Sequence, residues 1–144
     1  MGPLVLYNAL IRRSIDLRAL YRDAAAQAQE PGLRAVLGEN AATLDQLIVE
    51  LQAQIRSSGA IPVAHGRVGG HAQRQLVAWL LASAPHRDQA WIRRLARSEA
   101  ALLQAFERGI EQAPADTALV LRRQLPRLHG IHLDMHSLAR AGRC

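Results

Sequence analysis

Three histidines near the C-terminus, His129, His132 and His136, have the type and the spacing to bind a metal ion. They occur in the segment RLHGIHLDMHSLAR, residues 127–140, which has the composition of a helix. At about 100° per residue, the three side chains fall within one sector of about 60° of such a helix. Imidazole nitrogens on one helical face can chelate zinc or iron, so this segment is the first candidate for chemistry.

A row of histidines along one helix is not yet a metal site, because tetrahedral zinc needs ligands that converge from different directions. A second helix must contribute, and Glu99 is the best candidate, since it is the carboxylate near the apolar line of its own predicted helix. We favour an interpretation without metal, in which Glu99 is a flank residue paired with an arginine of a neighbouring helix. His132 then packs in or near the core with its nitrogens hydrogen-bonded, and His129 and His136 line a solvated edge. Zinc or iron is the alternative, and a pH-sensitive histidine edge lies between the two.

The composition is that of a single helical domain. The chain has 144 residues, of which 49% are apolar and 21% charged. A chain of this length and composition can bury one core without disulfides or bound metal ions. Aromatic residues are only 3%, so the core must be aliphatic. The only cysteine is Cys144, which excludes an intramolecular disulfide and a cysteine-based zinc site. No apolar run is long enough to cross a membrane and no secretory signal is visible, so we expect a cytoplasmic protein of a bacterium.

The net charge is +6, and every basic residue is arginine. A genome rich in G and C explains the absence of lysine better than a functional choice does. Three arginine pairs, 18/22, 93/97 and 123/127, place like charges one helical turn apart, which is mildly unfavourable. We expect carboxylates on neighbouring helices to compensate them; an acidic protein partner is the alternative. Nucleic acid is not expected, because no recognition motif is visible and aromatic residues are too few for base stacking.

Chain breakers and apolar periodicity predict five helices in one domain, residues 1–144. Pro3 fits a first helical turn, Asp116 is the expected N-cap of the last helix, and Pro126 should kink that helix. Four of the helices are long and of matched length, which favours a four-helix bundle. The long crossover between the second and third of these carries a short extra helix, which is the ferritin-like arrangement. The predicted helices cover about 4–29, 33–57, 71–84, 87–112 and 116–141.

The short helix has an apolar surface that is wider than one stripe needs. If the bundle does not cover this surface, an exposed patch favours a homodimer. The residues that form it are Leu76, Val77, Trp79, Leu80 and Leu81.

Four segments together resemble bacterial ferritin-like four-helix-bundle proteins that are known only as a domain of unknown function. They are LYRDAAAQAQEPGLRAVL (20–37), IRSSGAIPVAHGRVGG (55–70), ARSEAALLQAFERGIE (96–111) and LRRQLPRLHGIH (121–132). Their order and spacing carry the likeness over nearly the whole chain. The sequence departs from the family pattern at Asp23, Ser98, Ala100 and Phe106. The resemblance implies the fold and no established reaction.

A ferritin-like fold raises the question of a di-iron site, which the residues do not fit. Such a site needs one Glu from each of two helices and Glu-x-x-His from each of the other two. No Glu-x-x-His occurs, and residues 116–141 contain no Glu at all. We therefore expect a non-catalytic helical-bundle protein, with no catalytic residue and no cofactor, that acts by binding or self-association. The alternative is a degenerate ferritin-like metal-binding or oxidoreductase bundle.

Overall fold

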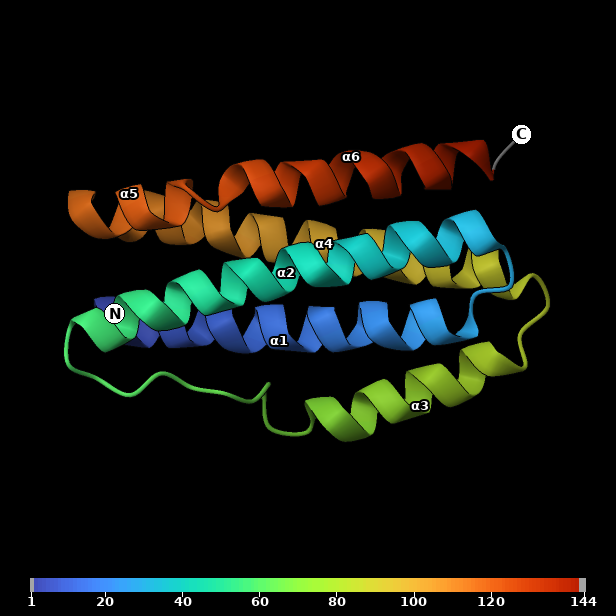
Figure 1. Cartoon of the computed structure of the whole chain (residues 1–144), viewed down its shortest axis with the longest axis horizontal. Coiled ribbons are helices and arrows are strands. Elements are labelled where there is room, and N and C mark those ends of the chain that lie inside the picture. Colours follow the sequence, from blue (N-terminus) through green and yellow to red (C-terminus); the bar gives the residue numbers. More distant parts are fainter. Residues whose placement is uncertain (1, 143–144) are drawn as a thin grey trace.

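Six helices follow one another along residues 2–142, the part of the chain that the computed structural model describes. They are α1 (Pro3–Gln27), α2 (Pro31–Ser57), α3 (Gly70–Ala82), α4 (Arg87–Gln112), α5 (Ala115–Arg122) and α6 (Leu125–Ala141). The long helices lie side by side, with α3 outside them against α1 and α4 (Figure 1). The predicted all-helical bundle is confirmed for these residues, whereas Cys144 lies outside them.

The turn between α1 and α2 is built from residues that the sequence marks as chain breakers. Pro31 occupies the first turn of α2, where its missing N–H costs nothing. The carboxylate of Glu30 caps the same helix by accepting two free backbone N–H groups at 2.7 and 2.9 Å. Asp88, in the first turn of α4, accepts two backbone N–H groups of the turn at 2.8 and 3.0 Å. This polar contact fixes the α1–α2 hairpin against the start of α4.

The last predicted helix is two helices rather than one kinked helix. Pro126 has no N–H to donate to the carbonyl of Arg122, and its ring would clash with that carbonyl. The chain therefore ends α5 at Arg122 and starts α6 at Leu125, so that Pro126 lies in a first turn. The prediction that Asp116 is the N-cap is also wrong, because α5 begins at Ala115 and Asp116 lies inside its first turn.

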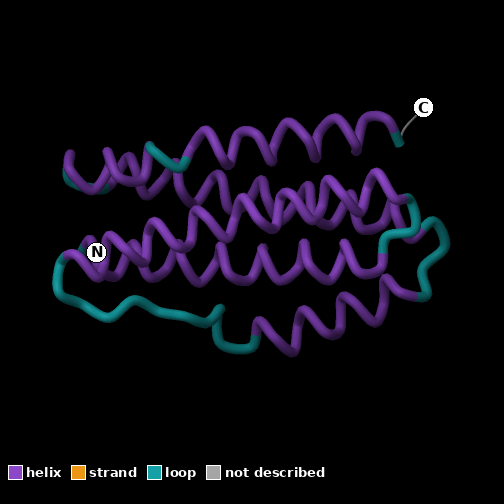
Figure 2. The backbone as a smooth tube through the Cα atoms, in the orientation of Figure 1, coloured by secondary structure: helices purple, strands orange, loops and turns teal. Residues whose placement is uncertain are grey.

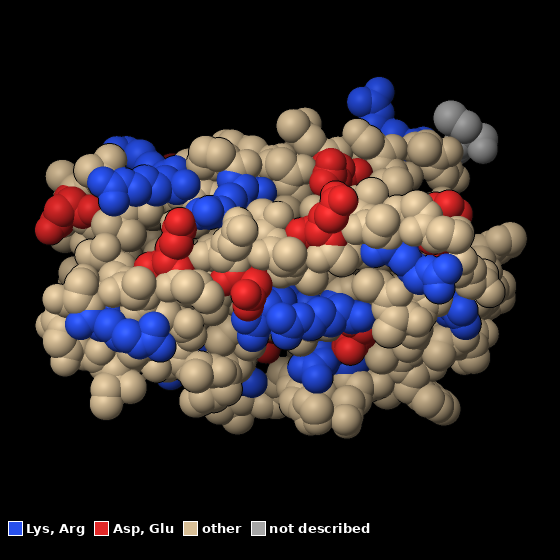
Figure 3. Space-filling view, viewed as in Figure 1, with Lys and Arg blue, Asp and Glu red and all other residues tan. Residues whose placement is uncertain are grey.

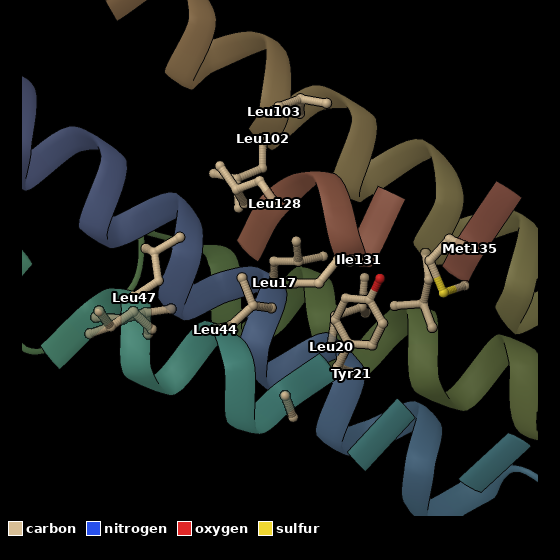
Figure 4. Packing of buried hydrophobic residues seen from close by; sticks show 14 of the residues in the cluster. Leu17, Leu20, Tyr21, Leu44, Leu47, Leu102, Leu103, Leu128, Ile131 and Met135 are labelled. Carbon is tan, nitrogen blue, oxygen red and sulfur yellow. The ribbon is translucent and has the colours of Figure 1, made fainter. Parts of the chain in front are cut away.

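The core between the long helices is mainly aliphatic, as the composition predicts, and it also contains the aromatic side chains of Tyr7, Tyr21, Trp91 and Phe106. Figure 4 shows leucine and isoleucine side chains from α1, α2, α4 and α6 meeting between the ribbons, beside Tyr21 and Met135. Each fully buried side chain of this size contributes about 1.5–3 kcal/mol to folding relative to an exposed one. The largest fully buried side chains are Trp91, Tyr21, Phe106, Ile11, Leu37, Leu44, Leu47, Ile48, Leu51, Ile55, Leu95 and Leu121.

The connection between α2 and α4 runs along the bundle and carries α3 (Figure 2). Asp16 of α1 holds this crossover: its carboxylate accepts a hydrogen bond from Arg67 Nε at 2.7 Å. The backbone passes so close that a Cβ at Gly66 would lie 1.9 Å from Asp16 Oδ1, and one at Gly70 would lie 2.8 Å from it. A side chain at Gly66 or Gly70 would therefore displace the Asp16 carboxylate from the position in which it holds the crossover.

Among the described residues, one of the three like-charged arginine pairs is compensated at both residues, and a second, 123/127, at Arg127 only. Asp45 lies between Arg18 and Arg22, with N–O distances of 2.6 and 3.9 Å. Arg127 forms an ion pair with Glu50 of α2. Acidic and basic side chains are interleaved on the face that presents α2 and α6 (Figure 3). These pairs join neighbouring helices across the bundle surface.

The third pair, Arg93 and Arg97, has no carboxylate partner among residues 2–142. Both side chains are exposed on α4, beside Leu80 and Leu81 of α3. The expected compensation is therefore absent here.

Within the described residues, every helix is too short or too polar to cross a lipid bilayer.

Candidate functional site

Glu99 is the centre of a polar cluster between α4 and α6. It is only 2% exposed, and its Oε1 lies 2.7 Å from Nδ1 of His132 on α6. The prediction of a flank residue paired with an arginine is therefore wrong. The physical reason is its position four residues after Leu95 and three before Leu102, both buried, which places Glu99 on the inward stripe itself.

The environment of Glu99 acts on its charge in two opposing ways. Burial raises the pKa of this carboxyl above its ordinary value, because the ionised form loses water. The hydrogen bond and the positive charge that His132 can supply lower the pKa. Burial is the larger effect, so the site is costly to ionise unless a cation or a proton donor lies against the carboxylate.

The histidine row divides into two residues at the cluster and one outside it. His132 has a 32% exposed side chain, and its ring lies 4.0 Å from the ring of His136, tilted by 56°. One ligand atom each from Glu99, His132 and His136 lies within 4.8 Å of the others. His129 is exposed and does not join them. The structure thus brings together three of the four candidate residues, and α4 supplies the second direction that the row lacked.

Tyr21 and Asn40 bring two more polar side chains to the inside of the bundle. The Tyr21 hydroxyl is buried and lacks a hydrogen-bond partner of good geometry within residues 2–142. Burial first, and then the negative charges of Glu99 and Asp134, raise the pKa of Tyr21, while Asn40 opposes the rise. The Asn40 amide faces Met135 Sδ at 3.9 Å, a weak acceptor. In the sequence Tyr21 occupies an apolar position of its helix, and its hydroxyl leaves no separate signal.

The outward face of α3 is a second candidate surface. Leu76, Trp79 and Leu80 are 55%, 71% and 53% exposed, and no residue of α3 is fully buried. Val77 and Leu81 point to the opposite side and are partly buried against the core. The prediction of a broad apolar surface therefore holds for three of its five residues. These three define the α3 face.

Polar contacts rather than deep packing attach α3 to the bundle. Arg74 Nε lies 2.9 Å from Asp23 Oδ2 of α1, and Gln27 Nε2 donates to the carbonyl of Ala78 at 3.1 Å. A cleft of about 170 Å³ remains between α1, α3 and α4. Such a helix has one side anchored and one side free to meet another surface.

Comparison with known proteins identifies a family for this chain but no activity. Residues 6–112 match a family described as a domain of unknown function (DUF2383). No curated protein and no solved structure matches the chain. The matched segment contains α2, α3 and α4 and nearly all of α1, and it includes Glu99 and the α3 face, whereas the histidine row lies beyond it. Because the match covers well over half of the chain, the protein belongs to the DUF2383 family, whose members share a domain of unknown function.

Proposed function

We propose that this protein is a non-catalytic helical bundle that self-associates, with a second copy of the chain packing on the α3 face. The observation that carries the proposal is the exposure of Leu76, Trp79 and Leu80, three large apolar side chains side by side on one short helix. An exposed apolar patch of this kind marks an interaction surface. The long α2–α4 crossover also supports a ferritin-like arrangement of the bundle, which supplies a scaffold for this surface.

The chemistry of the α3 face suits a second copy. The other exposed residues of the helix are Ala72, Gln73, Gln75 and Ala82, besides His71, which contacts Arg74. None of these four carries a charge, so two copies can meet through a two-fold axis without burying a charged group of α3. The space-filling view is largely tan along the edge where α3 lies (Figure 3).

The size of the surface sets the strength of the contact. A helix of 13 residues is about 20 Å long. A pair of such helices buries less than the roughly 800 Å² per partner of a standard interface. The dimer should therefore be weak, and its population should rise with protein concentration.

The response to salt concentration distinguishes self-association from the binding of an acidic protein partner. Arg93 and Arg97 lie next to Leu80 and Leu81, so a homodimer brings their charges toward those of the other copy. Raising the salt concentration shortens the Debye length to well below about 10 Å and weakens this repulsion. Self-association should therefore strengthen with salt, whereas an acidic protein bound at the same place would be released by it.

Cross-linking at one position of α3 tests the geometry of the proposal. Gln75→Cys, in a chain with Cys144→Ser, places a thiol beside the α3 face without removing an apolar side chain. A short bis-maleimide should join two Gln75→Cys chains efficiently. The matched control is Gln104→Cys, at an exposed glutamine of α4 outside the face, which should give only collisional cross-linking. Equal yields for the two variants would contradict a dimer through α3.

A further inference from the structure

We propose that Glu99, His132 and His136 form a mononuclear zinc site of the Glu-His-His type. This inference goes beyond self-association and uses a different part of the fold, between α4 and α6. From sequence alone, the interpretation without metal is favoured because a histidine row needs a ligand from a second helix. The structure places that ligand, Glu99, at the row.

The distances between the three groups suit a single small cation. Zinc binds imidazole nitrogen and carboxylate oxygen at about 2.0–2.2 Å, which puts neighbouring ligand atoms of a tetrahedron about 3.4 Å apart. The ligand atoms of Glu99, His132 and His136 already lie within 4.8 Å of one another. Side-chain movements of about 1 Å would bring the ligand atoms to these distances, with Glu99 Oε1 and His132 Nδ1 moving apart from 2.7 Å and the wider pairs approaching each other.

The two histidines have the spacing of a helical chelate. Residues four apart lie on the same face of a helix, and two histidines at this spacing bind zinc together. The rings of His132 and His136 lie 4.0 Å apart, and one nitrogen of each lies within 4.8 Å of the other and of a Glu99 oxygen. His129 is one turn earlier and stays outside the cluster, so it supplies an internal control.

The third ligand, the Glu99 carboxylate, approaches from the interior of the bundle and supplies the negative charge. Glu99 projects from α4, and its carboxylate is the nearest anion to His132. A divalent cation beside this buried carboxylate replaces the water that burial removed. Two neutral imidazoles and one carboxylate leave a net charge of +1 on the zinc complex, and a water molecule can complete the tetrahedron.

An ion can reach the site without unfolding the bundle. His136 is exposed and the side chain of His132 is 32% exposed, so the cluster opens at the surface of α6. Zinc binds an ionised carboxylate and neutral imidazoles, so the hydrogen between Glu99 and His132, whose atoms are 2.7 Å apart, must leave that position. It moves to the other ring nitrogen of His132 when Glu99 is already ionised and His132 neutral, and it passes to water when the pair holds one proton more.

Zinc titration of the untagged full chain, after treatment with a chelator, tests the proposal. Isothermal calorimetry should give one zinc per chain with a dissociation constant in the micromolar range or tighter. Cobalt substitution should give the visible absorption of a tetrahedral site. His136→Gln changes an exposed residue and should fold normally, yet it should lose at least about tenfold in affinity together with the cobalt spectrum. Glu99→Gln should lose affinity to a similar degree.

The control is His129→Gln, which removes an imidazole from the same helix. Its zinc affinity should stay within about twofold of the wild type, since His129 is outside the cluster. Three results would overturn the proposal: no zinc binding at micromolar concentration, zinc binding that survives His136→Gln, or equal loss of affinity in His129→Gln and His136→Gln.

Discussion

The carboxylate of Glu99 on α4 and the imidazole of His132 on α6 are hydrogen-bonded at 2.7 Å, with the carboxylate sealed inside the bundle and the imidazole reaching its surface. This pair joins two helices that are far apart in sequence. It also places the only buried carboxylate of residues 2–142 beside a side chain that can carry a proton or hold a cation. The stability of the bundle and any metal chemistry therefore depend on the same contact.

Two substitutions of Glu99 should separate the contribution of its size and hydrogen bond to stability from the contribution of its negative charge. Glu99→Gln keeps a side chain of the same size whose amide can donate to or accept from His132 Nδ1, so we expect nearly unchanged stability at neutral pH. Glu99→Ala leaves His132 Nδ1 without this partner and opens a cavity, which should cost about 1–3 kcal/mol or more. Urea unfolding in the presence of a chelator measures both. A larger loss for Gln than for Ala would show that the negative charge itself stabilises the fold.

The pH dependence of stability should carry the sign of a buried acid. Burial raises the pKa of Glu99 above its ordinary value of 4.5, so its contribution to folding is fully present below pH 4.5 and is lost as pH rises through the folded value. The wild type should therefore lose stability relative to Glu99→Gln as pH rises above 4.5, with His132 reducing the size of the effect. Unfolding curves of both proteins at pH 4 and pH 8 check this, and an opposite trend would show that the ion pair with His132 dominates.

The exposed histidines should contribute little to stability when no metal is bound. His129 and His136 both lie at the surface of α6, so replacing both by Gln should change the free energy of unfolding by less than about 0.5 kcal/mol. Thermal melting with a chelator present is the measurement. A loss of more than 1 kcal/mol would mean that the contact between the rings of His132 and His136 holds α6 in place.

Two glycines should respond in opposite directions to alanine. At Gly66 a Cβ would lie 1.9 Å from Asp16 Oδ1, so Gly66→Ala should detach the crossover from α1 and destabilise the protein. At Gly38, inside α2, a Cβ meets nothing within 4 Å, so Gly38→Ala should stabilise by about 0.5–1 kcal/mol. Melting temperatures of the two variants test this. Destabilisation by both, or by neither, would contradict the close approach at Asp16.

Much of the fold could be predicted from residue types alone. Proline, glycine and apolar spacing predict the helix ends to within a few residues, because these signals are local. The break between α5 and α6 was predicted as a kink, since Pro126 shows that a hydrogen bond is lost but not how the chain adjusts. The sequence offered two partners for Glu99, an arginine as the favoured one and the histidine row as the alternative, and it could not decide between them because the choice depends on how α4 and α6 are rotated against each other.

For the surface residues too, the sequence predicts part of the structure and not the rest. Leu76 and Leu81 look alike in sequence, but one is exposed and the other partly buried. The difference arises from the side of α3 that rests on α1 and α4, which is a tertiary property. Arg18 and Arg93 likewise look equivalent, although only the former faces a carboxylate. Local patterns thus identify the candidate residues, and packing decides which of them share a site.

Molar mass as a function of concentration tests whether the protein associates with itself through α3. Static light scattering of the full chain should show a mass that rises from monomer toward dimer as concentration increases. Trp79→Asp places a charge at the centre of the α3 face and should hold the protein at the monomer mass. The control Leu133→Asp changes a residue of α6 that is 66% exposed and should leave the association unchanged. A wild type that stays monomeric at the highest concentration, or a dimer that survives Trp79→Asp, would exclude self-association through the α3 face.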